Sequence, residues 1–289
     1  MVSASSNQLS LPGYWDPFPR ASIDFCEPNY TQSYYVAEVL NSVSSLAIAY
    51  LGVVGIYRTY LRSHVTDCAF EKKCFYYLYT CALLIGLGST CLHATLTAVG
   101  QAADEIPMLL SNVPFFALML EIKSEPNNIK NKWLPPFIWV AWAFSVGWYL
   151  YWQENYFMFL LFYIGSVVTL VSWMASLCFV KRSDKWEEEK RKQFLVPYFC
   201  YAMGAYAVLG FGSWITDMLL CETILASSFK FLQAFMHPVW HLGAMLGTHL
   251  AVCLVAMFRA IAMKKEFEVR SFGGLPFVEV IGNGKAKKK

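Results

Sequence analysis

Long apolar runs separated by short polar segments make up most of the chain. Each run is long enough, or nearly so, to cross the roughly 30 Å hydrocarbon core of a bilayer as an α-helix. The pattern predicts an all-α membrane protein built as one bundle of seven transmembrane helices. The expected spans cover residues 34–57, 75–97, 104–122, 133–151, 155–180, 196–220 and 232–262.

The composition also indicates a membrane protein. Of the 289 residues, 57% are hydrophobic, 17% are aromatic and only 15% are charged, which is too apolar for an ordinary soluble domain. We expect three parts: a lumenal arm over residues 1–33, a seven-helix domain over 34–262 and a cytosolic tail over 263–289. The arm lacks a basic segment followed by an apolar core, so we expect no cleavable signal peptide.

Basic residues are distributed unevenly among the polar segments. Except for Arg20 and Lys230, all 23 Lys and Arg residues lie after the first, third and fifth spans or at and beyond the end of the seventh. Because basic loops stay in the cytosol, this bias predicts a lumenal or extracellular N-terminus and a cytosolic C-terminus. The net charge of +3 then reflects topology. The chain has no basic stripe interleaved with stacking aromatics, which argues against a nucleic-acid partner.

Three histidines, His93, His237 and His241, lie inside strongly apolar segments. Ionisable side chains are costly in a bilayer and usually functional there. His237 and His241 are four residues apart and share one helix face, and all three are expected in the lumenal halves of their spans. Three neutral imidazoles can hold Zn²⁺ and leave its fourth position open for water, so the set predicts a catalytic zinc site. The alternative for each ring is a hydrogen bond to a neighbouring helix.

Other polar groups are expected at a similar depth. Ser89, one helical turn before His93, is a candidate hydrogen-bond donor to a developing oxyanion, or it bonds back to its own helix. Asp104 is a candidate proton carrier between water and a leaving group, or a charge at a helix N-terminus near the interface. Glu105 shares that ambiguity. Asp217 is a candidate carboxylate for orienting a ligand imidazole.

The arm carries a second polar set, in which Asp24, Glu27 and Asn29 are followed by Glu38 at the start of the first span. Carboxylate, amide and backbone oxygens are the ligands that Ca²⁺ prefers, although this spacing is not that of an EF-hand. A solvated acidic loop is the alternative. Asn29-Tyr30-Thr31 is also a glycosylation sequon. The two ideas compete, because a metal-bound Asn29 would be inaccessible to the transferase.

Of the nine cysteines, only Cys26 and Cys221 are expected on the lumenal side. An oxidising lumen would permit a disulfide between them. Two free thiols are the alternative.

Six segments together resemble the alkaline ceramidase family, in order and over nearly the whole chain. They are Gly13–Trp15, Ser22–Tyr30, Ala37–Glu38, Gly86–Leu96, Asp104–Met108 and His237–His241. The resemblance implies a seven-helix, zinc-dependent enzyme that cleaves the amide bond of ceramide, phytoceramide or dihydroceramide into a sphingoid base and a fatty acid. Phe25 stands where many members have Trp, and Pro28 replaces a common acidic residue.

The resemblance also implies roles for individual residues. The family's zinc ligands map to His93, His237 and His241, and its catalytic serine and aspartate map to Ser89 and Asp104. A calcium site maps to Asp24, the backbone carbonyl of Phe25, Glu27, Asn29 and Glu38. The family's lumenal disulfide maps to Cys26 and Cys221.

Two other functional classes fit a seven-helix bundle with buried polar groups. One is a zinc-stabilised receptor similar to the progestin and adiponectin receptor group. The other is a transporter, although the chain has no paired broken helices or repeated halves. Lys285 and Lys287 resemble a retrieval signal for the endoplasmic reticulum and Golgi, which predicts a multi-pass protein of those membranes. A basic juxtamembrane tail is the simpler interpretation of these lysines.

Overall fold

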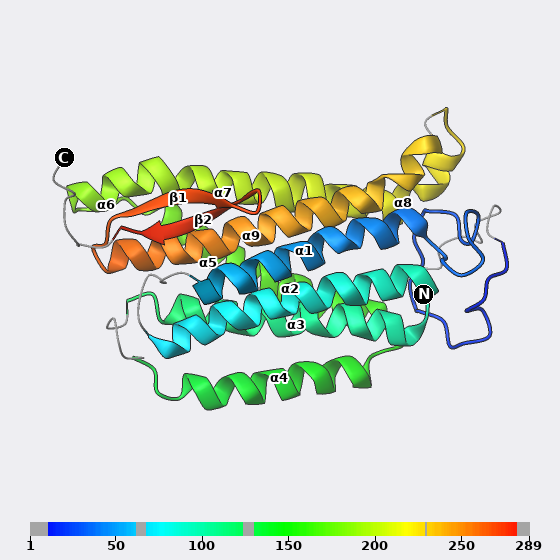
Figure 1. The fold of residues 1–289 in the computed structure, drawn as a ribbon, viewed down its shortest axis with the longest axis horizontal. Coiled ribbons are helices and arrows are strands. Elements are labelled where there is room, and N and C mark those ends of the chain that lie inside the picture. Colours follow the sequence, from blue (N-terminus) through cyan, green and yellow to red (C-terminus); the bar gives the residue numbers. More distant parts are fainter. Residues whose placement is uncertain (1–10, 62–67, 124–129, 229, 282–289) are drawn as a thin grey trace.

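The computed structural model describes residues 11–61, 68–123, 130–228 and 230–281. Its long helices run side by side, with the N-terminal arm at one end of the bundle and the C-terminal end of α9 at the other (Figure 1). The elements are α1 (Val39–Leu61), α2 (Ala69–Thr95), α3 (Ala98–Leu120), α4 (Leu134–Tyr151), α5 (Tyr156–Phe179), α6 (Lys185–Lys190), η1 (Arg191–Leu195), α7 (Val196–Met203), η2 (Gly204–Phe211), α8 (Gly212–Leu225), η3 (Lys230–Ala234), α9 (Met236–Ala262), β1 (Phe267–Phe272) and β2 (Leu275–Val280).

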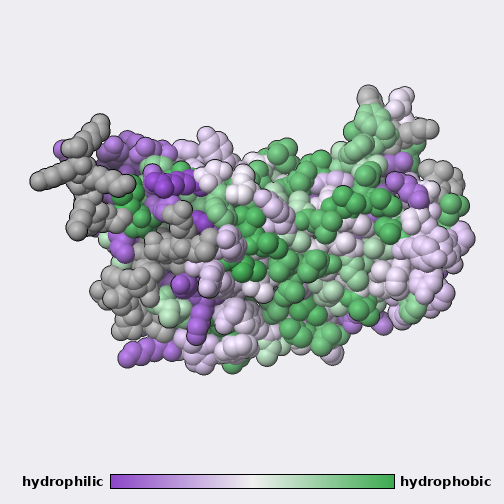
Figure 2. All heavy atoms as spheres, viewed as in Figure 1, coloured by the Kyte–Doolittle hydropathy of each residue, from purple (hydrophilic) through white to green (hydrophobic). Residues whose placement is uncertain are grey.

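Six helical segments among the described residues are long and apolar enough to cross a membrane. They are Val39–Tyr60, Ala69–Thr95, Ala98–Leu120, Tyr156–Phe179, Lys185–Leu225 and Phe231–Ala262. Hydrophobic residues gather over the middle of the bundle, and hydrophilic residues lie toward its two ends (Figure 2). These features support a multi-pass membrane protein, because a bilayer presents an apolar layer between two polar surfaces.

The remaining expected span, over residues 133–151, corresponds to α4 and is not among these six. This helix contains no charged residue, but its Trp, Tyr and Pro side chains lower its hydropathy. In Figure 1 it runs along the same direction as the other long helices, beside α3.

The first three helices pack closely because glycines stand where their backbones meet. A Cβ atom on Gly86 of α2 would lie 2.1 Å from the backbone nitrogen of Ala49 in α1. A Cβ atom on Gly88 would lie 2.1 Å from the carbonyl oxygen of Ala103 in α3. Only glycine permits such an approach, so these two positions determine how near α2 comes to its neighbours.

The segment Lys185–Leu225 forms one continuous helical stretch that contains two π-helical parts, η1 and η2. The second packs against α9, where a Cβ atom on Gly243 would lie 2.5 Å from the backbone nitrogen of Gly210. π-helical turns often occur at functional sites, and η2 borders the cavity described below.

Local hydrogen bonds explain why α1 and α3 begin at places that differ from the expected span limits. α1 begins at Val39, because the carboxylate of Glu27 accepts hydrogen bonds from the backbone N–H groups of Leu40 and Asn41. α3 begins at Ala98, because the Thr97 side chain accepts a hydrogen bond from the Gly100 N–H. Asp104 and Glu105 therefore lie in the second turn of α3, where a first-turn position was expected.

The tail expected over residues 263–289 contains an antiparallel hairpin of β1 and β2. Phe267, Leu275 and Phe277 of this hairpin are buried in the same core as residues of α9. The backbone carbonyl of Pro276 lies 2.6 Å from Nε2 of His249, near the middle of α9. The hairpin is thus part of the packed bundle, whereas Lys285 and Lys287 lie outside the described residues.

We predict that Gly86→Ala destabilises the protein by about 1–3 kcal/mol, because the new methyl group meets backbone atoms that cannot rotate away. Gly165→Ala in α5 is the matched control, since a Cβ atom there meets nothing within 4 Å. Replacing this helical glycine should be neutral or stabilise by up to about 1 kcal/mol. Thermal unfolding of the two purified variants in detergent measures the difference, and equal midpoints would contradict the packing argument.

Candidate active site and metal centre

Three histidines from two helices meet inside the bundle. His93 comes from α2, and His237 and His241 come from successive turns of α9. Their ring centroids are 4.6–5.1 Å apart, and each residue is at most 3% exposed. One ligand nitrogen from each ring lies within 4.8 Å of the other two, so the group can hold a metal ion.

Each ring has a supporting group at its Nδ1 atom. Glu38 Oε2 lies 2.5 Å from His93 Nδ1, and Ser44 Oγ lies 2.7 Å from His241 Nδ1. Asp217 Oδ2 lies 3.4 Å from His237 Nδ1, within ion-pair distance but outside hydrogen-bond geometry. Metal-binding histidines commonly use one ring nitrogen for such a partner and the other for the metal.

The Nε2 atom of His93 is buried and has no hydrogen-bond partner among the described residues. A buried polar atom without a partner is costly, and a metal ion would satisfy it. Phe25 of the arm packs over this group, with its ring centroid 4.8 Å from that of His93 and 4.0 Å from that of His237. The donor set therefore fits a transition metal that accepts imidazole nitrogen in a site closed from the arm side.

Ser89 lies beside the histidine group on α2. It is 2% exposed, and its Oγ atom is 3.4 Å from Nε2 of His241. The Oγ atom of Ser45 in α1 lies 3.0 Å from Ser89 Oγ. A Cβ atom on Gly88 would also lie 2.7 Å from the backbone nitrogen of Asp104. This contact brings the Ser89 turn of α2 against the Asp104 turn of α3.

Ser89, Asp104, His237 and His241 all line one cavity of about 270 Å³. Most of the other lining residues are apolar or aromatic and come from α1, α2, α3, α5, η2, α8 and α9. A mainly apolar cavity with a few convergent polar groups is typical of a site for a small, largely hydrophobic molecule. The polar groups can act on a carbonyl derivative held there, because they combine metal ligands, a hydroxyl and a carboxylate.

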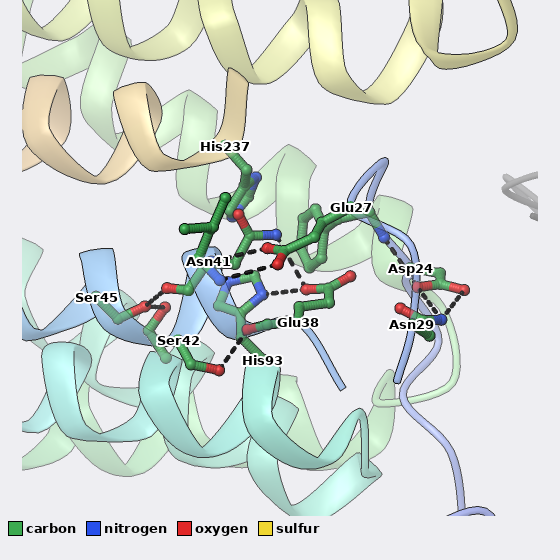
Figure 3. A network of polar contacts seen from close by, with 12 residues as sticks. Asp24, Glu27, Asn29, Glu38, Asn41, Ser42, Ser45, His93 and His237 are labelled. Carbon is green, nitrogen blue, oxygen red and sulfur yellow. Dashed lines mark hydrogen bonds and ion pairs between the residues drawn. The ribbon is translucent and has the colours of Figure 1, made fainter. Parts of the chain in front are cut away.

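The arm places a second polar network next to the histidines (Figure 3). The Asn29 amide donates to both carboxylate oxygens of Asp24 at 3.2 Å, and Asn41 Nδ2 donates to Glu38 Oε2 at 3.1 Å. Burial raises the pKa of the Asp24 and Glu27 carboxyl groups, and the nearby Asp217 charge adds to the effect. Within the described ranges, only the three histidines form a compact group of metal-binding side chains of the His, Cys, Asp and Glu types.

A disulfide between Cys26 and Cys221 joins the arm to α8. The pairing expected from the resemblance is therefore present, with a Cα–Cα distance of 5.5 Å. Further backbone bonds tie the arm to the α2–α3 connection, including Ala21 N–H to Leu96 O at 2.9 Å and Ala98 N–H to Pro19 O at 2.8 Å. The arm is thus held against the histidine group from several directions.

Sequence reasoning missed three supporting contacts. Glu38 was expected only among the calcium ligands, yet it contacts His93. Ser44 and Ser45 were not singled out, yet they contact His241 and Ser89 respectively. The available signal was the polar run Asn41–Ser45 early in an otherwise apolar span, since polar side chains inside a membrane helix usually have a partner.

Comparison with known proteins gives a consistent result. A family model described as Ceramidase matches residues 18–277. The alkaline ceramidase of Drosophila melanogaster is 25% identical over 285 residues, covering 91% of this chain and 89% of that protein. Alkaline ceramidase of Arabidopsis thaliana is 27% identical, with 93% and 96% covered. Alkaline ceramidase 3 of Mus musculus is 26% identical, with 91% and 92% covered.

We predict that the purified chain contains about one transition-metal ion and that His93→Ala loses it, because two imidazoles remain where three are needed. His249→Ala is the matched control, since His249 is another buried histidine of α9 and bonds to Pro276 instead. Elemental analysis of the native protein and both variants tests this. An unchanged metal content in His93→Ala would contradict the assignment.

Proposed function

Because this chain belongs to the ceramidase family, we propose that it hydrolyses the amide bond of ceramides to a sphingoid base and a free fatty acid within the membrane. The observation that carries the proposal is one mainly apolar cavity lined by Ser89, Asp104 and two members, His237 and His241, of the buried three-histidine group. A ceramide has one polar amide region and two hydrocarbon chains, which matches this combination of polar centre and apolar walls.

We propose zinc as the metal, held by His93, His237 and His241. Three neutral imidazoles supported by carboxylate or hydroxyl partners are typical of catalytic zinc sites. Zinc bound there would supply Lewis-acid polarisation of the amide carbonyl and would lower the pKa of a coordinated water.

Residues of the chain would then position the amide and transfer protons. The Ser89 hydroxyl would donate a hydrogen bond to the amide oxygen as negative charge develops on it. The Asp104 carboxylate would take a proton from the attacking water and pass it to the nitrogen of the leaving amine. Phe25 would keep bulk water from the arm side of the histidines. Asp217 would orient the ring of His237, and Glu38 would orient the ring of His93.

We also propose that α4 completes a bundle of seven spans, with the arm in the lumen and the C-terminus in the cytosol. The uncharged α4 and the one-sided placement of basic residues support this topology. The proposed location is the endoplasmic reticulum, the Golgi or both. The disulfide of the arm suits an oxidising lumen.

Calcium is proposed for the arm, with ligands from Asp24, the Phe25 carbonyl, Glu27, Asn29 and Glu38. Glu27, Asn29 and Glu38 are each at most 3% exposed. Asn29 contacts Asp24 through its amide nitrogen, so its amide oxygen is the atom that would bind the ion. An ion at this position would brace the arm against the start of α1, where Glu38 contacts His93.

Asp104→Asn should lower ceramide hydrolysis by about 10²–10⁴-fold, because an amide cannot carry the proton. Ser89→Ala should lower kcat by about 10²–10³-fold through loss of one hydrogen bond to the developing oxyanion. Released sphingoid base measures the activity, and metal analysis shows whether the histidine group is intact. Full hydrolysis by Asp104→Asn with its metal retained would remove the aspartate from the scheme.

Asp24→Asn should weaken calcium binding and reduce hydrolysis while leaving the zinc content unchanged, because it removes a carboxylate ligand from the arm only. Asp16→Asn is the control, since this exposed acid lies in the same arm outside the proposed set. Equilibrium binding of calcium and zinc analysis are measured on both variants. Identical calcium affinities would leave no role for Asp24 as a ligand.

A further inference from the structure

A second cavity of about 80 Å³ continues from the first, farther from the histidines. The two cavities share Tyr163, Val167, Val171, Met203, Tyr206 and Thr248. At this junction the hydroxyl groups of Tyr163 and Tyr206 lie 2.8 Å apart and hydrogen-bond to each other. We propose that this tyrosine pair is a gate that determines how long a hydrocarbon chain the enzyme accepts, an inference that rests on the proposed ceramide hydrolysis.

The position of the pair supports a role in chain length. At 1.5 Å per residue, Thr248 lies about 10 Å beyond His241 along α9, and Leu254, in the second cavity, lies about 20 Å beyond it. Half of a hydrocarbon core of about 30 Å is about 15 Å. A chain that stops at the gate is therefore shorter than one leaflet, and a chain that passes it can be longer.

The same distance argues against recognition of a polar group. The hydroxyl groups of a ceramide lie within a few bonds of its amide, whereas Thr248, which lines the junction together with the tyrosine pair, lies about 10 Å along α9 from His241. Two polar side chains of the second cavity already have partners, since Asn112 donates to Ser166 Oγ at 2.6 Å and Ser111 donates to the Met108 carbonyl at 2.8 Å. What remains for a substrate there is mainly apolar surface.

The two tyrosines come from different segments, so they can separate. Tyr163 lies on α5, and Tyr206 lies on the π-helical segment η2. The hydroxyl groups of the two tyrosines are joined by one hydrogen bond. A neutral hydrogen bond contributes only about 0.5–1.5 kcal/mol of net stability. A hydrocarbon chain that moves from the bilayer into this cavity passes from one apolar environment to another, so its burial contributes little free energy. Discrimination between chain lengths therefore comes mainly from the steric fit at the junction.

Two variants should shift the length preference in opposite directions. Tyr163→Ala removes one ring from the junction and should raise the ratio of kcat/KM for long-chain over short-chain ceramides about tenfold, the range that misfit methylene groups produce in apolar pockets. Ala251→Phe fills the second cavity, which Ala251 lines, and should lower the ratio about tenfold. Tyr201→Ala is the control, because Tyr201 lies on α7, is 63% exposed and lines neither cavity.

The assay uses the purified full chain with two ceramide series, one varying the acyl chain at a fixed sphingoid base and one varying the base at a fixed acyl chain. Opposite shifts in either series support the gate. Each ratio is internal to one preparation, so partial misfolding does not change it. If Tyr163→Ala does not fold, Tyr163→Phe should shift the ratio in the same direction by a smaller factor.

Unchanged ratios in both series, or the same shift in Tyr201→Ala, would overturn the gate while leaving ceramide hydrolysis standing. Failure of the native chain to hydrolyse any ceramide would instead overturn the proposed function, and the gate with it.

Discussion

The rest of the site depends on keeping three imidazole rings together in a buried part of the bundle. Buried polar groups are costly unless each finds a partner. Glu38, Ser44 and Asp217 each contact one nitrogen of one ring. Glu38 and Ser44 lie at and near the start of α1, and Asp217 lies on α8. The other nitrogens can then converge on a metal ion, and the whole arrangement of arm, α1, α2, α8 and α9 serves that convergence.

The arm has a structural role in this arrangement that its polar composition does not suggest. Glu27 accepts hydrogen bonds from backbone N–H groups at the start of α1. Because Glu38 directly precedes this helix, these bonds help to position it next to His93. Phe25 covers two of the imidazoles, and the neighbouring Cys26 is bonded to Cys221 of α8. Since Asp217 lies one turn before Cys221 on that helix, the disulfide also holds the partner of His237 in place.

Features with a strong local pattern were predictable from the sequence. Apolar runs indicate membrane helices, and the four-residue spacing of His237 and His241 places both rings on one helix face. Features that depend on distant contacts were not. The start of α1 at Val39 requires Glu27, the role of Glu38 requires His93, and the packed hairpin after α9 requires a groove in the bundle. α4 was predicted as a span but is not among the six long apolar helices. Its Trp and Tyr residues suit membrane interfaces, yet they lower its mean hydropathy.

The two sides of the cavity differ in packing, and this difference would separate the proposed chemistry from the proposed binding of substrate. In an 18-residue stretch of Phe231–Ala262, 67% of the residues are buried, whereas only 17% are buried in such a stretch of Tyr156–Phe179. Ser89 and the histidines stand on α2 and α9, which pack through glycines against neighbouring backbones. Catalytic groups require such rigid support, because small displacements reduce rates strongly. On the other side of the cavity, α5 has fewer protein neighbours to hold it, so it can yield to a bound molecule without disturbing the three histidines.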